Sequence, residues 1–220
     1  AVAESTTRVL KSLVPGVTED EMAARVAADL LPQHITPSVL LMATDERIFR
    51  YKHAVPRKGV LRKYGMLNLC ARRDGMVISI TRFVHFGAMP AELAANFERT
   101  ARINAELFHA SRPGATSADL YAAAARGYAA AGFPDGINQH HQGGPCGYRE
   151  RDWIATPTGT QTLRSTQGLA WNPSLNGAKA EDTALLRDGS IEILTTTPDL
   201  PAIEAEVGGT IYRSAGVLLP

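Results

Sequence analysis

The chain has 220 residues, 45% of them hydrophobic, and its 23 basic and 22 acidic side chains nearly cancel. This composition supports one sizeable core or two small ones, in what we expect to be a single domain, and argues against a nucleic-acid binder that relies on a bulk positive field. No apolar run approaches the length of a membrane span, and two isolated cysteines, Cys70 and Cys146, indicate neither a disulfide framework nor a zinc site, so we expect a reducing, cytoplasmic compartment.

Two similar pairs of helices are predicted, one at the start of the chain and one near its middle. Leu10–Met22 reads LKSLVPGVTEDEM and Leu107–Leu120 reads LFHASRPGATSADL, so both contain Pro-Gly-x-Thr. In each copy we expect one helix to end before Pro-Gly and a second to begin at the threonine, with Glu21 or Asp119 completing a capping box. The doubled unit predicts two pseudo-symmetric halves with a site between them.

A hairpin is predicted over Met66–Arg82, which reads MLNLCARRDGMVISITR. Its Asp-Gly step suits a tight primed turn, because both residue types tolerate a positive φ. With a two-residue loop, Cys70 faces Ser79 and Asn68 faces Thr81, so uncharged polar side chains share one face while aliphatic side chains fill the other. Further strands are expected near Ile48–Tyr51, Phe83–Phe86, Leu169–Trp171, Thr183–Leu186 and Ile191–Leu194.

Five motifs in this order resemble the pita-bread fold of methionine aminopeptidase, aminopeptidase P, prolidase and creatinase. They are the doubled Pro-Gly-x-Thr unit, the hairpin ending in Thr81-Arg82, HHQGGPCG at 140–147, the Asn172-Pro173 step and the Glu181-Asp182-Thr183 step. The resemblance spans roughly the whole chain and implies one α+β domain over residues 1–220, with a helix pair and an antiparallel sheet in each half. The chain starts without methionine and lacks the N-terminal domain of larger relatives, so we expect a fragment or a processed chain.

Peptidases of this family hold two metal ions with two Asp, one His and two Glu. The resemblance places the two Asp positions at Asn68 and Ser79, the His at Gly144 and the first Glu at Asn172, and only the last ligand survives, as Glu181. Hard divalent cations prefer anionic oxygen and imidazole ligands. A site with one negative charge therefore predicts no dinuclear metal centre and no metal cofactor, and the alternative is a divalent metal such as Mn or Co.

The resemblance to creatinase implies that the fold can hydrolyse a C–N bond without metal, with a histidine moving the proton. His53-Ala54-Val55-Pro56 resembles the His-x-x-Pro step of the family, so His53 is the leading general acid/base, and Glu181 is expected to orient water or bind a substrate cation. Amides, hydroxyls and arginines can bind a carbonyl or carboxylate. The candidates for substrate binding are Asn68, Ser79, Arg82, His140, His141, Gly143, Gly144, Arg151 and Asn172.

Each assignment also has a structural alternative. A histidine before a proline is often a loop residue, paired histidines can bond the backbone of a tight turn, and buried asparagines can be satisfied core amides. A buried cysteine is more often a small apolar residue than a nucleophile. Structural roles are expected for Cys70, His85, His109, Trp153 and Trp171.

Three functions are compatible with these residues. The preferred one is a metal-independent hydrolase of an amide, amidine or dipeptide-like C–N bond that uses His53 and Glu181. The second is a metal-dependent Xaa-Pro aminopeptidase or dipeptidase, and the third is a non-catalytic protein that binds a peptide or small metabolite. The expected partner is a small molecule or short peptide, with no nucleic acid and no membrane, and a homodimer is expected because many relatives are dimers.

Overall fold

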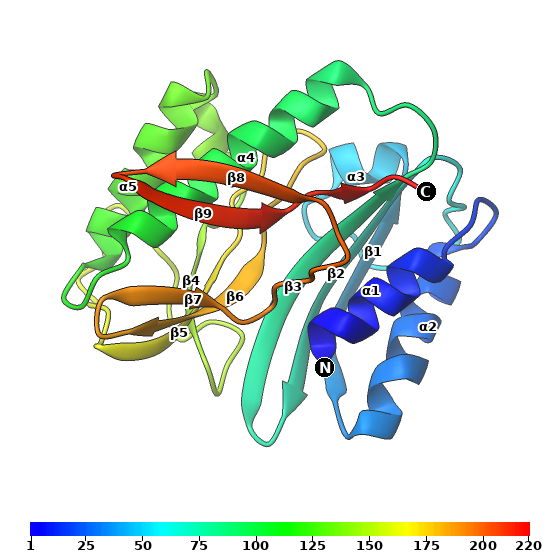
Figure 1. The fold of residues 1–220 in the computed structure, drawn as a ribbon, viewed down its shortest axis with the longest axis horizontal. Helices are drawn as coiled ribbons and strands as arrows, with labels where there is room; N and C mark the ends of the chain where they lie inside the picture. The colour runs from blue at the N-terminus through cyan, green and yellow to red at the C-terminus, as the bar shows by residue number, and fades with distance from the viewer.

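Two four-stranded sheets, each accompanied by a pair of helices, form the two halves of the molecule (Figure 1). The computed structural model describes residues 1–220. The first half consists of α1 (Val2–Ser12), α2 (Glu19–Leu30), a 3-10 turn (Leu31–Gln33), β1 (Thr36–Thr44), α3 (Glu46–Arg50), β2 (Tyr64–Arg73) and β3 (Met76–His85). The second half consists of α4 (Ala91–Ala110), α5 (Ser117–Ala130), a 3-10 segment (Pro134–Gln139), β4 (Gly143–Cys146), β5 (Thr166–Trp171), β6 (Asp182–Arg187) and β7 (Ser190–Ile193).

The end of the chain returns to the first half. A two-stranded ribbon of β8 (Ala202–Val207) and β9 (Thr210–Ala215) packs against α4, and β10 (Val217–Leu218) pairs in parallel with β3 (Figure 1). The sheet orders are therefore β1-β2-β3-β10 and β4-β5-β6-β7. No helix combines the length and the apolar composition needed to cross a membrane.

The predicted helix starts are confirmed in both halves. Thr18 and Thr116 are the N-caps of α2 and α5, and each accepts a hydrogen bond from the backbone N–H three residues later. The carboxylates of Glu21 and Asp119 bond back to the N-cap N–H at 2.7 and 2.9 Å. The repeated Pro-Gly-x-Thr sequence therefore gives the same helix–turn–helix unit twice.

The predicted hairpin of β2 and β3 is confirmed in turn and register. Its two turn residues have φ values of 52° and 80°, the left-handed conformations that Asp-Gly favours. Cys70 lies opposite Ser79 and Asn68 opposite Thr81. The aliphatic face packs with α1 and α2 into the first core, and the polar face is left for the junction with the second half.

Each half has its own apolar core, which agrees with the expectation of two small cores, and a third, smaller cluster that includes Tyr64, Phe83 and Phe97 lies beside them. Side chains of α1, α2 and the first sheet form one cluster, and side chains of α4, α5 and the second sheet form another. Trp171 is fully buried in the second core, where its indole N–H donates to Ser111 at 3.1 Å, and Trp153 packs against the same core. Both tryptophans have the structural role expected of them.

One strand prediction is wrong. Ile48–Tyr51 was expected to be a strand, but Glu46–Arg50 forms the short helix α3. Arg47 of this helix pairs with the buried Glu19 at 2.9 Å, and this tertiary contact outweighs a short local pattern. The strand expected near Phe83–Phe86 is confirmed as the end of β3. The remaining predicted strands correspond to β5, β6 and β7.

Candidate active site

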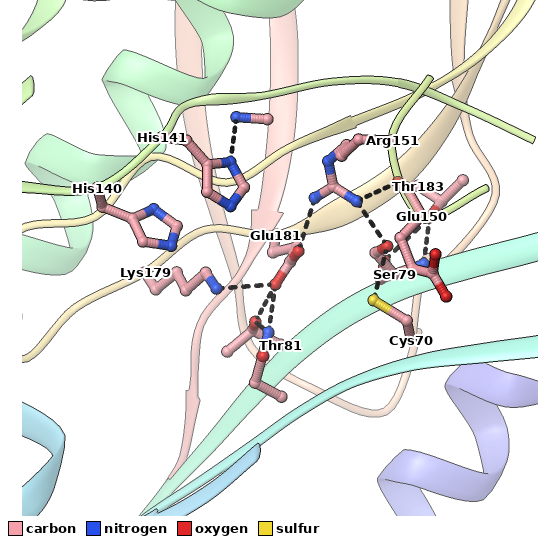
Figure 2. A network of polar contacts seen from close by, with 12 residues as sticks. Cys70, Ser79, Thr81, His140, His141, Glu150, Arg151, Lys179, Glu181 and Thr183 are labelled. Atoms are coloured by element: carbon pink, nitrogen blue, oxygen red, sulfur yellow. Dashed lines mark hydrogen bonds and ion pairs between the residues drawn. The ribbon is translucent and has the colours of Figure 1, made fainter. Parts of the chain in front are cut away.

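The site lies where the two sheets meet, along β3 and the segment that leads into β6. The N–H of Thr81 donates to the carbonyl of Glu181 at 3.1 Å. The hydroxyl of Thr183 accepts from the N–H of Ser79 at 2.8 Å and donates to its carbonyl at 2.9 Å. These bonds hold the polar face of the first hairpin against Glu181 (Figure 2).

Glu181 is a buried carboxylate enclosed by donors (Figure 2). Arg151 lies 2.9 Å from its Oε1 and Lys179 lies 3.1 Å from its Oε2. The Thr81 hydroxyl donates to Oε2 at 2.6 Å, and the Asn68 amide donates to the same oxygen. Burial alone raises the pKa of a carboxyl, but Lys179, Arg151 and Thr81 together lower the pKa of Glu181 to about 2. Since cations of the chain itself take both oxygens, the expected binding of a substrate cation by Glu181 has no room here.

Arg151 links Glu181 to the second polar position of the hairpin. Its Nη1 donates to Ser79 Oγ at 2.8 Å, and that oxygen lies 3.2 Å from Cys70 Sγ. Burial, followed by the charge of Glu181, raises the pKa of Cys70, so this thiol stays protonated and is not an activated nucleophile. Ser79 and Asn68 are both satisfied inside the protein, which is the structural alternative considered for buried polar groups.

Three histidines gather beside this ion cluster. Ring nitrogens of His53, His140 and His141 lie within 4.8 Å of one another, and the Nε2 atoms of His53 and His140 are 3.0 Å apart. His53 is exposed, His141 is half-buried and His140 is buried, so this end of the site opens to solvent. Substrate binding by His140 and His141 stays a prediction, and His141 also accepts the backbone N–H of Gly143, which is the structural alternative considered for paired histidines.

Burial, reinforced by nearby cations, keeps these imidazoles neutral. Burial is the main cause that lowers the pKa of His140 to about 2, and the charge of Lys179 lowers it further. Burial likewise lowers the pKa of His141 to about 4, and the charges of Arg151 and Lys179 add to this effect. The pKa of His53 is lowered by burial and then by Lys179. All three rings are therefore unprotonated near neutral pH.

Three neutral imidazoles at this spacing resemble a metal site, but two features oppose a cation. The N–H of Gly143 donates to Nδ1 of His141 at 3.2 Å, so the proton of that neutral ring is on Nε2, the atom that faces the cluster. The ammonium of Lys179 acts on all three rings and repels a second cation. The trio fits a hydrogen-bonding role better than ligation.

The glycines at 143 and 144 are required by close backbone packing. A Cβ on Gly144 would lie 1.9 Å from the carbonyl oxygen of Trp153, and one on Gly143, whose φ is +89°, would lie 2.2 Å from that of Ala170. No side chain, the family's histidine included, fits at Gly144 without moving backbone. The amide of Gly143 is already bonded to His141, so the prediction that it binds substrate is corrected.

Replacing Gly144 by alanine is expected to destabilise the fold by about 1–3 kcal/mol, since the new methyl group meets backbone that cannot rotate away. Urea unfolding measures this loss. Gly147 is the matched control, because a Cβ there meets only Met76 Cε at 3.9 Å, and its alanine variant should unfold close to the native chain. Equal stability of the two variants would show that the Trp153 carbonyl is not held against Gly144.

Two further predicted residues lie apart from the ion cluster. The guanidinium of Arg82 is 1% exposed and donates to Asp182 and to the carbonyl of Thr195, both at 2.7 Å, so the prediction that it holds a substrate carboxylate is wrong. Asn172 is buried after β5, and its Oδ1 has no hydrogen-bond partner. Its role in substrate binding stays a prediction.

Sequence reasoning missed Lys179, which contacts the central carboxylate. The available signal was its position two residues before Glu181, because alternate residues of an extended segment point to the same side. His85 in β3 and His109 in α4 occupy the elements predicted for them.

The chain is similar to one family of peptidases and to several solved structures. The model of metallopeptidase family M24 matches residues 1–191, and no curated protein matches the chain. The dipeptidase PepE from Mycobacterium ulcerans has a TM-score of 0.78 at 20% identity, covering 90% of this chain and 56% of its own. The X-Pro aminopeptidase from Thermotoga maritima MSB8 has a TM-score of 0.78 at 16% identity, with coverages of 100% and 60%.

A third similar structure belongs to a subunit of a protein complex. The N-terminal domain of FACT complex subunit SPT16 from chickpea, Cicer arietinum, has a TM-score of 0.70 at 14% identity, with coverages of 89% and 56%. This chain therefore spans 56% to 60% of the length of these three proteins. The matches confirm the predicted α+β pita-bread fold, and identities this low establish the fold alone.

Proposed function

We propose that this chain, which belongs to metallopeptidase family M24, is a peptidase-like hydrolase. Its substrate is a small amide, amidine or dipeptide-like molecule, in which it cleaves a C–N bond. It does so without the family's dinuclear metal centre. The observation that carries the proposal is the pairing of Glu181 with Arg151 and Lys179 at 2.9 and 3.1 Å, with His53 and His140 retained beside it.

The residues of the site do not fit a dinuclear centre. Asn68, Ser79 and Asn172 are neutral, Gly144 has no side chain, and the charge of Glu181 is already offset by two fixed cations. Two divalent ions would add four positive charges to a buried site that holds one carboxylate, and carboxylate ligands are what such ions require. The two cationic side chains thus supply the positive charge beside Glu181.

His53 is proposed as the proton carrier. In the tautomer whose Nε2–H donates to His140 Nε2, the Nδ1 of His53 keeps a free lone pair, and the buried His140 stays neutral as the acceptor. Nδ1 of His53 takes a proton from water as the water oxygen attacks the substrate carbon. The C–N bond then breaks, and the same imidazole returns the proton to the leaving nitrogen. The role of Glu181 in this scheme is to hold Arg151 and Lys179, and it moves no proton.

A hydrolysis screen on chelator-treated protein tests this function. Native protein dialysed against a strong chelator is expected to release amine from at least one member of a panel of dipeptides, N-acyl amino acids and amidines, at the rate seen before dialysis. Activity that disappears with chelation and returns with Mn²⁺ or Co²⁺ would support the metal-dependent Xaa-Pro peptidase instead. Release of amine, followed with a fluorogenic reagent, is the measurement.

A binding protein without turnover is the second candidate. It is supported by the similarity to the SPT16 domain, which belongs to a subunit of the FACT complex, and by the satisfied polar groups around Glu181. A panel that binds without release of amine would favour it. We also keep a homodimer and a cytoplasmic location as proposals, and the two free thiols suit a reducing compartment.

A further inference from the structure

We infer that the site binds a carboxylate, held between the ammonium of Lys179 and the Nε2–H of His141. If the proposed hydrolase function holds, its substrate is then a small acid, such as an N-acyl amino acid or a dipeptide with a free carboxyl end. The binding itself does not depend on that function.

The charges around Lys179 favour an anion. Arg151 and Lys179 lie against the carboxylate of Glu181, and Lys52 is close enough to Lys179 for their charges to interact, while Glu150 is the other carboxylate near Arg151. Burial and then the charge of Lys179 lower the pKa of Lys52, and the charge of Lys179 also acts on the three histidines. Positive charge therefore exceeds negative charge here, and a bound anion would restore the balance.

Two hydrogen-bond donors have capacity left for such an anion. An ammonium has three N–H groups, and Lys179, which is 6% exposed, uses one of them in its ion pair with Glu181. His141 accepts the N–H of Gly143 at Nδ1, so Nε2 carries its proton, and that N–H makes no hydrogen bond within the chain. Figure 2 shows both side chains directed toward the region around Glu181.

The arginines, to which the sequence pointed, are engaged with groups of the chain itself. Asp182 neutralises Arg82, and the terminal nitrogens of Arg151 donate to Ser79, Glu181 and a backbone carbonyl, while its remaining Nε–H is buried. A carboxylate has two oxygens for two donors, whereas a phosphate needs more donors than Lys179 and His141 offer. The ring of His53, whose centroid lies 5.6 Å from that of His141, is exposed to solvent.

Calorimetric titration with two matched probes tests the inference. N-acetylalanine carries a carboxylate, and N-acetylalaninamide is the same molecule with a neutral amide in its place. The native chain is expected to bind the acid at least about tenfold more tightly than the amide, because only the acid gains charge-assisted hydrogen bonds. Inorganic phosphate is titrated as a third probe.

Variants assign the preference to its residues. Lys179→Met should lose the preference for the acid, and Lys58→Met, which changes an exposed lysine, should retain it. His141→Ala, which leaves the ion pair of Lys179 intact, serves as a second variant if Lys179→Met does not fold, and it should weaken the preference. Native protein that binds neither probe, or both equally, overturns the inference.

Two other results would also overturn it. One is a preference for the acid that survives in Lys179→Met or is untouched in His141→Ala. The other is inorganic phosphate binding as tightly as N-acetylalanine. Because binding is measured without turnover, a failed hydrolysis screen and a failed titration remain separate results.

Discussion

Replacing Glu181 by glutamine is expected to destabilise the protein by about 3–5 kcal/mol, because the change leaves two buried cations without their counter-ion. The pKa of Glu181, which Lys179 and Arg151 lower against the effect of burial, points in the same direction. Urea unfolding at neutral pH measures the loss.

The control for this variant is an ion pair on the surface. Glu204 lies 2.8 Å from Arg213, and both side chains are exposed, so Glu204→Gln should cost less than about 1 kcal/mol. Adding Lys179→Met to Glu181→Gln removes one of the stranded cations and should recover part of the lost stability. If the two glutamine variants unfold at the same urea concentration, Glu181 is not the buried counter-ion described here.

The contribution of Glu181 to stability should also depend on pH. The folded pKa of Glu181 lies below the unfolded value, so its stabilisation is fully present above about pH 4.5 and is lost as the pH falls toward 2. In that window the native chain should lose stability faster than Glu181→Gln, and the difference between the two chains should shrink. A difference that stays constant from neutral pH to pH 2 would contradict the lowered pKa.

Replacing His53 by alanine is expected to lower turnover by a factor of roughly 10² to 10⁴ while the chain stays folded, since the variant has no group to move the proton. His34→Asn is the matched control, because His34 is exposed, lies outside the site and has a φ of 58° that asparagine tolerates. Turnover of a substrate from the hydrolysis screen is measured for all three chains. Unchanged turnover in His53→Ala would remove this residue from the mechanism.

The pH profile of the native chain gives a second readout for His53. Burial and then Lys179 lower the pKa of its imidazole below 6.5, and the neutral ring is the active base. The value of kcat/KM should therefore rise with pH through an apparent pKa below 6.5 and then stay level. A fall in kcat/KM over the same range would mean that a protonated group acts there.

Local sequence rules predicted the parts of the fold that short segments determine. The Asp-Gly turn sets the register that places Asn68 opposite Thr81, and the threonine caps start α2 and α5. The short helix α3 was missed, because contacts with the distant Glu19 decide its conformation.

The sequence shows neutral residues at the expected metal-ligand positions Asn68, Ser79 and Asn172. It does not show that Lys179 and Arg151 pair with Glu181. Lys179 was overlooked because nothing in its local sequence shows that Glu181 is buried and needs a counter-ion. Arg82 was assigned to the site although it follows Thr81 directly, and adjacent residues of a strand point to opposite faces. The distant partners Asp182 and Thr195 settle where its side chain lies.

We propose that fixed cations around Glu181 take the place of the metal ions held by the sites of metal-dependent relatives. Elemental analysis of protein purified without chelator, incubated with Mn²⁺, Co²⁺ or Zn²⁺ and then freed of excess ion, measures this. We expect far less than one equivalent of each metal per chain. One to two equivalents that stay bound to the native chain and are lost in Glu181→Gln would contradict it.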